Sequence, residues 1–141
     1  MADNHSKDVR SKNMSHIRSK DTKPEVKARK YLFQHGFRYR KNDARLPGKP
    51  DIVLPKYKTV IFVNGCFWHK HDCPDFKWPS SNENYWRPKI LRNVERDEEN
   101  YQTLREAGWK IITIWECQLK NRVFEETMQE VIKKIRRNQV Y

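Results

Sequence analysis

The sequence predicts an α/β fold in which helices flank a mixed β-sheet. Residues 59–64 and 110–115 are rich in β-branched and other apolar side chains, which is typical of strands inside a sheet. Three longer segments repeat apolar residues at helical spacing and are interspersed with the predicted strands. A chain of this length accommodates one such core, so we expect a single domain, residues 1–141, with a basic arm in residues 1–20 and the folded core in residues 21–141.

The first helix is expected to begin at a cap formed by Thr22. A proline follows at position 24, Glu25 completes a capping box, and Gly36 is typical of a helix end. Its apolar positions, which should face the core, are Val26, Ala28, Tyr31, Leu32 and Phe33.

Three short strands are expected next. Residues 37–41 alternate aromatic and basic side chains, which predicts a strand with an exposed basic face. Residues 51–54 and 59–64 are separated by a short connection that starts with Pro55, so we expect an antiparallel hairpin with residues 59–64 as the central strand.

The rest of the chain predicts a loop, a long helix, one strand and a last helix. Residues 65–81 follow neither the helical nor the strand period, so a bound metal ion is the expected support for this loop. Apolar residues keep helical spacing across residues 83–107, and Gly108 ends that segment as a C-terminal cap does. Residues 110–115 predict a buried strand, and residues 123–137 predict a basic amphipathic helix.

The charge of the chain points to a polyanionic partner. Lys and Arg total 30 against 18 for Asp and Glu, and residues 1–50 alone hold 14 basic and 5 acidic side chains. Nucleic acid binds such a surface electrostatically, whereas a membrane surface requires an amphipathic helix that the first 20 residues lack. No run approaches the roughly 20 apolar residues of a membrane span and no signal peptide is recognisable, so we expect a cytoplasmic protein with no membrane partner.

Four residues form a candidate metal site. Cys66, His71 and Cys73 lie close together in the sequence, and Cys117 follows the strand predicted at residues 110–115. Zinc binds four nitrogen or sulfur ligands tetrahedrally, and a set with no open position is structural. An odd number of cysteines without an export signal argues against disulfides. The alternative is that the cysteines are small buried hydrophobic residues.

Asp51, at the start of a predicted strand, and His69, in the loop, suggest a hydrolytic site. A carboxylate at a strand end can hold a divalent cation, and a neutral histidine can take a proton from an attacking water, as in metal-assisted phosphodiester hydrolysis. Spacing alone favours the plainer interpretation of a turn-capping aspartate and an ordinary loop histidine.

Aromatic side chains gather around this loop and at the start of the long helix. In a basic protein they can unstack base pairs or stack on bases, although aromatic residues beside a sheet more often belong to the core. Adjacent residues 67 and 68 do not easily both face one side of a strand, which favours the DNA-wedge interpretation. The set comprises Phe67, Trp68, Trp78, Tyr85 and Trp86.

Several segments together resemble the very-short-patch repair (Vsr) DNA mismatch endonucleases. They are LPGKPDIVLP, VIFVNGCFWHKHDC, LRNVERDEEN and LREAGWKIITIWEC, and the opening RSKNMSHIRSKDTKPE matches as well, so the likeness covers about residues 8–120. It implies a PD-(D/E)XK-like nuclease fold in which a histidine-containing loop replaces the usual second acid and lysine, at Val63 and Gly65. It also implies a magnesium-dependent enzyme that nicks one DNA strand 5′ to the thymine of a T:G mismatch, which arises when 5-methylcytosine deaminates.

The resemblance implies roles for individual residues. Asp51 and the backbone carbonyl of Val63 would bind the catalytic Mg²⁺, and His69 would activate the attacking water. Glu25 and Asp97 would support the metal-bound waters or the histidine. Structural Zn²⁺ would be held by the four candidate ligands, Cys66, His71, Cys73 and Cys117.

For mismatch recognition, the resemblance implies aromatic wedges from the major groove and Met14, on the arm, from the minor groove. Since a mispaired step unstacks more easily than a paired one, such wedges select for the mismatch. The implied partners are double-stranded DNA with a T:G mismatch, DNA polymerase, and MutL-type and MutS-type repair proteins. A monomer suffices for one nick, in the bacterial cytoplasm and at the nucleoid when bound to DNA. The wedges would be Phe67, Trp68 and Trp86, and the residues that hydrogen-bond the mismatched bases would be Lys89 and Asn93.

One position departs from the family pattern in particular. Members often have histidine where this chain has Asn64, and more histidines where it has Lys70 and Asp72. Asparagine cannot act as a base at neutral pH, but it can hydrogen-bond a phosphate or a water. Two alternatives therefore stay open: a restriction-system nuclease that cuts undamaged DNA, and a zinc-supported DNA-binding module without activity.

Overall fold

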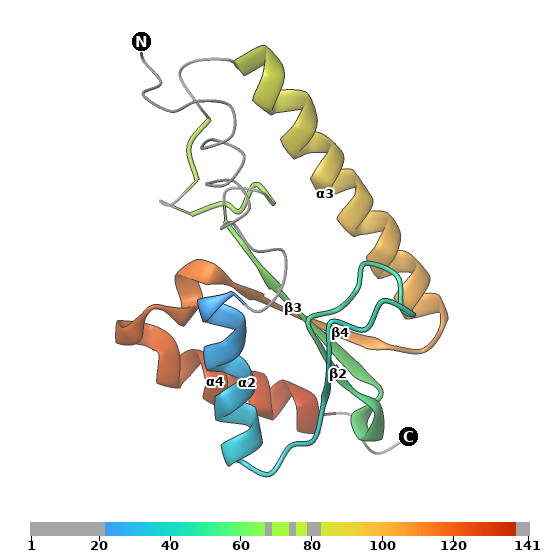
Figure 1. Ribbon diagram of the computed structural model, residues 1–141, viewed down its shortest axis with the longest axis vertical. Helices are drawn as coiled ribbons and strands as arrows, with labels where there is room; N and C mark the ends of the chain where they lie inside the picture. Colours follow the sequence, from blue (N-terminus) through green and yellow to red (C-terminus); the bar gives the residue numbers. More distant parts are fainter. Residues whose placement is uncertain (1–21, 67–68, 74–75, 79–82, 138–141) are drawn as a thin grey trace, which may run out of the picture.

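A four-stranded sheet separates one long helix from two shorter ones in the computed structural model (Figure 1). The shorter helices, α2 (Lys23–Gln34) and α4 (Asn121–Arg136), pack together on one face, and α3 (Glu83–Glu106) lies on the other. This arrangement confirms the prediction of a mixed α/β fold with a sheet flanked by helices. The structure describes residues 22–66, 69–73, 76–78 and 83–137.

The sheet has the order β1-β2-β3-β4 and contains both pairing directions. β1 (Arg40–Lys41) pairs antiparallel with β2 (Ile52–Leu54), and β2 pairs antiparallel with β3 (Thr59–Asn64), which confirms the predicted hairpin. β3 pairs parallel with β4 (Lys110–Trp115) after the crossover through α3. The carboxyl ends of β3 and β4 therefore lie at the same end of the sheet.

Strand side chains alternate between two cores of unequal size, because successive residues of a strand face opposite sides of the sheet. On the α2 and α4 side, 14 of the described residues form one buried cluster. On the α3 side, the buried cluster contains four residues, Val53, Val60, Phe62 and Leu104. The strands contribute Ile52, Leu54, Ile61, Ile112 and Ile114 to the larger cluster.

Helix α2 begins and ends where the sequence predicts. The Oγ1 atom of Thr22 accepts the backbone N–H of Glu25 at 3.4 Å, and the chain turns away at Gly36, whose φ is +88°. One predicted core position is wrong, since Phe33 is 55% exposed. Tyr31 and Leu32 take up the buried side of the helix at this turn, and the further rotation of about 100° per residue carries Phe33 out toward solvent.

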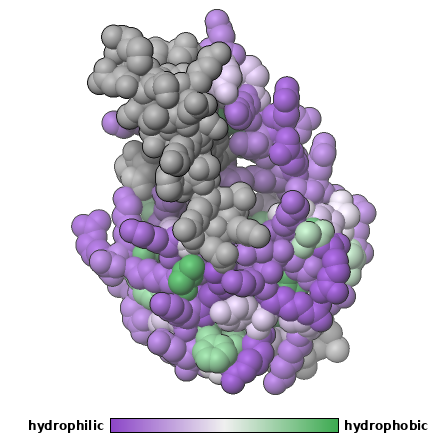
Figure 2. Space-filling model, in the orientation of Figure 1, coloured by the Kyte–Doolittle hydropathy of each residue, from purple (hydrophilic) through white to green (hydrophobic). Residues whose placement is uncertain are grey.

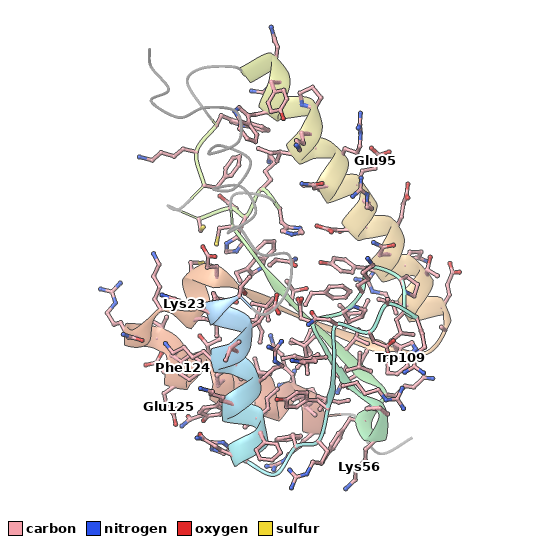
Figure 3. All side chains as sticks on the ribbon, in the orientation of Figure 1. Lys23, Lys56, Glu95, Trp109, Phe124 and Glu125 are labelled. Carbon is pink, nitrogen blue, oxygen red and sulfur yellow. The ribbon has the colours of Figure 1, made fainter. Side chains whose placement is uncertain are left out.

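Side-chain contacts fasten α2 to α4. Tyr31 donates its hydroxyl hydrogen to Glu125 Oε1 at 3.1 Å, and the Lys27 Nζ atom lies 4.3 Å from the centroid of the Phe124 ring. Phe124 and Glu125 are labelled in Figure 3, on the part of α4 that meets α2. This side of the sheet is held by apolar burial and by polar contacts between the two helices.

Other predicted elements differ in extent or in burial. The strand predicted at residues 37–41 keeps only its last two residues, because Phe37 is buried in the larger core before the strand begins. In β4 only Ile112 and Ile114 are buried, because these two face the larger core whereas the residues that alternate with them face the more sparsely covered α3 side. The last helix begins at Asn121, two residues before the predicted start, and α3 ends one residue before its predicted end.

The described part of residues 65–81 contains neither helix nor strand, as predicted. In Figure 2 the described side chains on the visible face are mostly hydrophilic, in keeping with the highly charged composition. None of the described helices combines the length and the apolar character needed to cross a membrane.

Candidate active site and metal site

A cleft of about 1170 Å³ opens between the sheet and α3. Its walls come from the start of α2, the loop before β2, the end of β3 and the middle of α3. The fold thus brings together residues from four separate segments of the chain. All four predicted catalytic side chains line the cleft, together with two further predicted site residues: Glu25, Asp51, Val63, His69, Asn93 and Asp97.

Two carboxyl groups lie next to each other in this cleft, and both are buried. Asp51 Oδ2 accepts the backbone N–H of Val63 at 2.6 Å, which fixes the carboxyl group against β3. Glu25 Oε2 accepts from Arg29, one helical turn later, at 3.2 Å. Burial raises the pKa of Asp51 to about 8; the Val63 N–H opposes this, and the neighbouring Glu25 adds to it. Such a buried carboxyl pair is chemically suited to a divalent cation, which favours oxygen ligands.

His69 is oriented by a carboxylate from α3. Its Nδ1 atom hydrogen-bonds to Asp97 Oδ2, and its backbone N–H donates to the Gly65 carbonyl at 3.3 Å. Among the described residues the Nε2 atom has no hydrogen-bond partner. Since an aspartate on Nδ1 fixes the ring and favours the tautomer with a free Nε2, His69 is arranged to accept a proton from a water in the cleft.

Asn64 lines the same cleft and is held from α3 as well. Its Nδ2 atom donates to the hydroxyl oxygen of Tyr101 at 3.1 Å. In the described part of the chain the amide oxygen has no hydrogen-bond partner. The departure from the family pattern therefore places a fixed amide, with an available acceptor, in the cleft.

The four candidate metal ligands converge at the carboxyl ends of the parallel strands. Asn64 is opposite Trp115 in the β3–β4 register, so Cys66 and Cys117, each two residues further along, leave the sheet close together. The loop then adds one histidine and one cysteine. The ligand atoms of Cys66, His71, Cys73 and Cys117 all lie within 4.8 Å of one another.

The surroundings of this group suit a structural metal ion. His71 stacks on Trp115 with ring centroids 4.0 Å apart and an interplanar angle of 8°, and its backbone N–H donates to the Cys66 carbonyl at 3.0 Å. Burial raises the pKa of the Cys66 thiol to about 12. Because thiolates are the form that binds metal, an ion in this position would have to displace that proton, as zinc does in proteins. Three sulfur atoms and one nitrogen atom fit a closed zinc site.

The residues predicted to contact DNA are only partly described. Trp86, Lys89 and Asn93 follow one another along one side of α3 at intervals of three and four residues. Asn93 lines the cleft, whereas Lys89 is exposed and lies beyond it, with its Nζ atom 3.4 Å from the Tyr85 hydroxyl. Met14, Phe67, Trp68 and the arm of residues 1–20 lie outside the described residues.

Sequence reasoning missed several residues of the site. Arg29 lies four residues after Glu25 in a predicted helix, so this spacing alone could have predicted their ion pair. Tyr101 was predicted only as an apolar position, because its contact with Asn64 depends on how α3 crosses the sheet. Lys49 and Arg96, which also line the cleft, were not singled out.

The sequence is similar to known DNA mismatch endonucleases and nicking enzymes. The family model described as DNA mismatch endonuclease Vsr matches residues 2–75. The type II nicking enzyme V.NmeAIP of Neisseria meningitidis is 52% identical over 124 residues, which is 87% of this chain and 89% of that protein. The DNA mismatch endonuclease Vsr of Escherichia coli K12 is 46% identical over 122 residues, 86% of this chain and 78% of that protein. The type II nicking enzyme V.XorIIP of Xanthomonas oryzae is 41% identical over 121 residues, 86% of this chain and 89% of that protein.

Proposed function

Because the chain belongs to the Vsr family of DNA mismatch endonucleases, we propose that it nicks one strand of double-stranded DNA 5′ to the thymine of a T:G mismatch. The nick would start short-patch repair of deaminated 5-methylcytosine. One observation carries the proposal: a single cleft holds the buried Asp51 and Glu25 carboxyl groups together with the His69–Asp97 hydrogen bond.

We propose the catalytic roles that the family resemblance implies, and these contacts support them. Asp51 and the Val63 carbonyl would hold Mg²⁺, and Glu25, fixed by Arg29, would hydrogen-bond waters around it. When bound, the ion supplies positive charge to the attacked phosphate and to the water. His69 Nε2 accepts the proton of the attacking water, and Asp97 stabilises the imidazolium that forms.

The architecture in this proposal is a PD-(D/E)XK-like nuclease fold with a histidine loop in place of the second acid and lysine. Support comes from Asp51 at the start of the β2–β3 hairpin and from its hydrogen bond to Val63. The metal held by Cys66, His71, Cys73 and Cys117 would be a structural Zn²⁺ that fixes the loop carrying His69.

Recognition of the mismatch would rely on aromatic wedges and on the arm, because mispaired bases unstack more easily than paired ones. Residues 1–141 would act as one domain and as a monomer, in the bacterial cytoplasm and at the nucleoid when bound to DNA. DNA polymerase and MutL-type and MutS-type proteins would be its functional partners. The wedge residues would be Met14, Phe67, Trp68 and Trp86, and the residues that hydrogen-bond the mismatched bases would be Lys89 and Asn93.

A nicking assay tests the proposal directly. Purified protein is incubated in magnesium, at stated salt, with a duplex carrying one T:G pair in a CTAGG-type context, beside its T:A twin and an EDTA control. We expect one nick, 5′ to the thymine of the T:G strand, that requires the divalent ion. Equal nicking of both duplexes, or cleavage that persists in EDTA, would contradict it.

A second candidate function has support in the names of two relatives, which are type II nicking enzymes. In that case the chain would nick at a sequence rather than at a mispair. The T:A twin decides between the two, because only the second candidate predicts that the paired duplex is cut.

A further inference from the structure

We propose that Lys49 and Arg96 form a phosphate clamp, in which two cations from two walls of the cleft hold the DNA backbone beside the bond that is cut. Lys49 lies in the loop before β2, and Arg96 lies on α3. The inference rests on the proposed function, since it names residues that would position its substrate. Both residues act on the phosphate backbone and neither carries the proton of the reaction.

The charges of the cleft favour such a pair. Four carboxyl groups line it, those of Glu25, Asp51, Asp97 and Glu116, and each of them that is ionised repels a DNA backbone. Besides His69, the basic side chains among the residues lining the described cleft are those of Lys49 and Arg96. A phosphate therefore approaches the site with least repulsion where these two side chains meet it.

Both cations are available to a ligand. Within the described part of the chain, neither side chain forms a hydrogen bond, an ion pair or a ring contact. Other basic residues nearby behave differently: Arg29 donates to Glu25 at 3.2 Å, and Arg45 donates to Asp43 at 2.9 Å. A guanidinium group that stands among carboxyl groups and pairs with none of them is free to bind a phosphate bidentately.

The loop that carries Lys49 packs against the helix that carries Arg96. A Cβ atom added at Gly48 would lie 3.1 Å from Asn100 Nδ2 and 3.1 Å from Phe62 Cε1, so the loop packs tightly against α3 at this point. Asn100 is one helical turn after Arg96 and shares its side of the helix. Lys49 directly follows the packed glycine, so both residues flank this junction and line the cleft.

The conformation of Lys49 supports a role for its side chain. Its φ is +48°, in the left-handed region that residues with a side chain rarely adopt and that glycine adopts freely. The chain nevertheless carries lysine here, at the wall of the cleft. Such residues recur at functional sites, although Lys58 has nearly the same φ outside the cleft, so it is the position of Lys49 at the cleft wall that matters.

Single-turnover nicking of the T:G duplex tests both residues against matched controls. Lys58 also has a left-handed φ, +51°, and lies outside the cleft, so Lys58→Gly controls for Lys49→Gly in charge and in backbone strain. Arg105 is an exposed residue of α3 outside the cleft, so Arg105→Gln controls for Arg96→Gln. We expect Lys49→Gly and Arg96→Gln to slow nicking at least about tenfold and each control to stay within about twofold. Arg96→Lys should recover part of the loss.

Binding to modified DNA provides a test that needs no cleavage. Single neutral methylphosphonate linkages are placed at successive positions around the expected nick, and affinity is measured in calcium at fixed salt. In the parent protein, one or two positions next to the nick should weaken binding, and Lys49→Gly or Arg96→Gln should remove the sensitivity at those same positions. A residue with only a structural role would lower affinity equally for all the duplexes.

The outcomes separate the clamp from the proposed function. If the parent nicks the T:G duplex while Arg96→Gln and Lys49→Gly match their controls, the clamp is wrong and the function stands. If the parent does not nick but methylphosphonate sensitivity follows the two residues, the clamp stands and the function is wrong. A methylphosphonate profile that is the same in the parent and both variants overturns the clamp in either case.

Discussion

The two faces of the sheet differ in how they are covered. On one face, α2 and α4 bury 14 described residues in a continuous cluster with the strands. On the other, α3 contributes Leu104 to a cluster of four, and the predicted catalytic residues lie beside this smaller cluster. In Figure 1 the two helices on the first side lie close against the sheet, whereas α3 extends past it.

The difference shows how one small domain supports both stability and a polar site. Apolar burial on the α2 and α4 side provides most of the driving force for folding, because that force scales with the apolar area removed from water. Sparse packing under α3 leaves room for carboxyl groups that would be too costly to bury in the larger core. If stability and chemistry are divided in this way, substitutions on the two faces of the sheet should have different effects.

The largest effect is expected for Asp51→Asn, on the sparsely packed side. Nicking should fall about 10³-fold or more, because the amide cannot supply the negative ligand that a catalytic cation needs. The melting temperature should stay the same or rise, since a buried carboxyl group next to Glu25 is removed. Single-turnover kinetics and thermal unfolding measure both.

Asp43→Asn is the matched control for this substitution. Asp43 lies in the same loop but outside the cleft, and its partner is Arg45, which lowers the pKa of Asp43 to about 2. It should keep nicking within a few-fold of the parent. Parental nicking by Asp51→Asn would show that the active site is misassigned.

Removal of the candidate metal ligand Cys73 should destabilise the end of the sheet at which β3 and β4 terminate. Cys73→Ala should lose bound zinc and lower the free energy of unfolding by several kcal/mol, because metal affinity is folding free energy in such sites. Metal analysis by mass spectrometry and thermal unfolding report the two effects. A stable variant without zinc would contradict the structural role.

Core truncations compare the two faces directly. Ile135→Ala, in the larger cluster, and Leu104→Ala, in the smaller one, should each cost about 2–5 kcal/mol, with Leu104→Ala at the lower end because its cluster borders the cleft and can relax. At a temperature where both variants are folded, only Leu104→Ala should reduce nicking, since it shifts α3. The reverse pattern in nicking would refute the division between the faces.

The pH dependence of stability follows from Asp51. Its folded-state pKa of about 8 lies above the usual value for an unfolded chain, about 3.9, so between these values the folded protein holds a proton that the unfolded chain has released. The stabilising contribution is complete below about pH 4 and is lost as the pH rises to about 8. In metal-free buffer, the stability of the parent relative to Asp51→Asn should fall by more than about 1 kcal/mol across this range.

Chemical denaturation at several pH values measures that difference. A gap between the parent and Asp51→Asn that does not change with pH would mean that the Asp51 carboxyl group is not protonated in the folded state. Added magnesium should reduce the slope, because a bound cation favours the ionised carboxylate.

The smallest effect is expected at Phe33, on the outer side of α2. Phe33→Ser should change the free energy of unfolding by no more than about 0.5 kcal/mol, because the ring is 55% exposed and its described contact is with the Arg38 guanidinium. The same substitution at Phe37, which is 2% exposed, should cost several times more. Similar losses at both positions would show that Phe33 belongs to the core after all.

Local patterns predicted most of the elements. The Thr22 cap, the turn at Gly36 and the long helix ended by Gly108 depend on residues within a few positions of one another, and the structure confirms each. The burial of Phe33 and the extent of the strand at residues 37–41 were less well predicted. Both depend on which side chains occupy the core, and the periodicity of the sequence does not decide that.

The candidate site likewise combines features that the sequence predicted with features that only the fold decided. From the sequence came the residue types, the resemblance to the Vsr endonucleases and the list of candidate ligands and catalytic side chains. Only the tertiary structure decided that Asn64 and Trp115 are in register, which brings Cys66 and Cys117 together, and that α3 carries Asp97 to His69. Only packing decided that Gly48 rests on Asn100, with Lys49 beside it. The physical reason is that helix caps and strand patterns arise from contacts between near neighbours, whereas strand register, helix crossing and the burial of Asp51 arise from contacts between segments far apart in the chain.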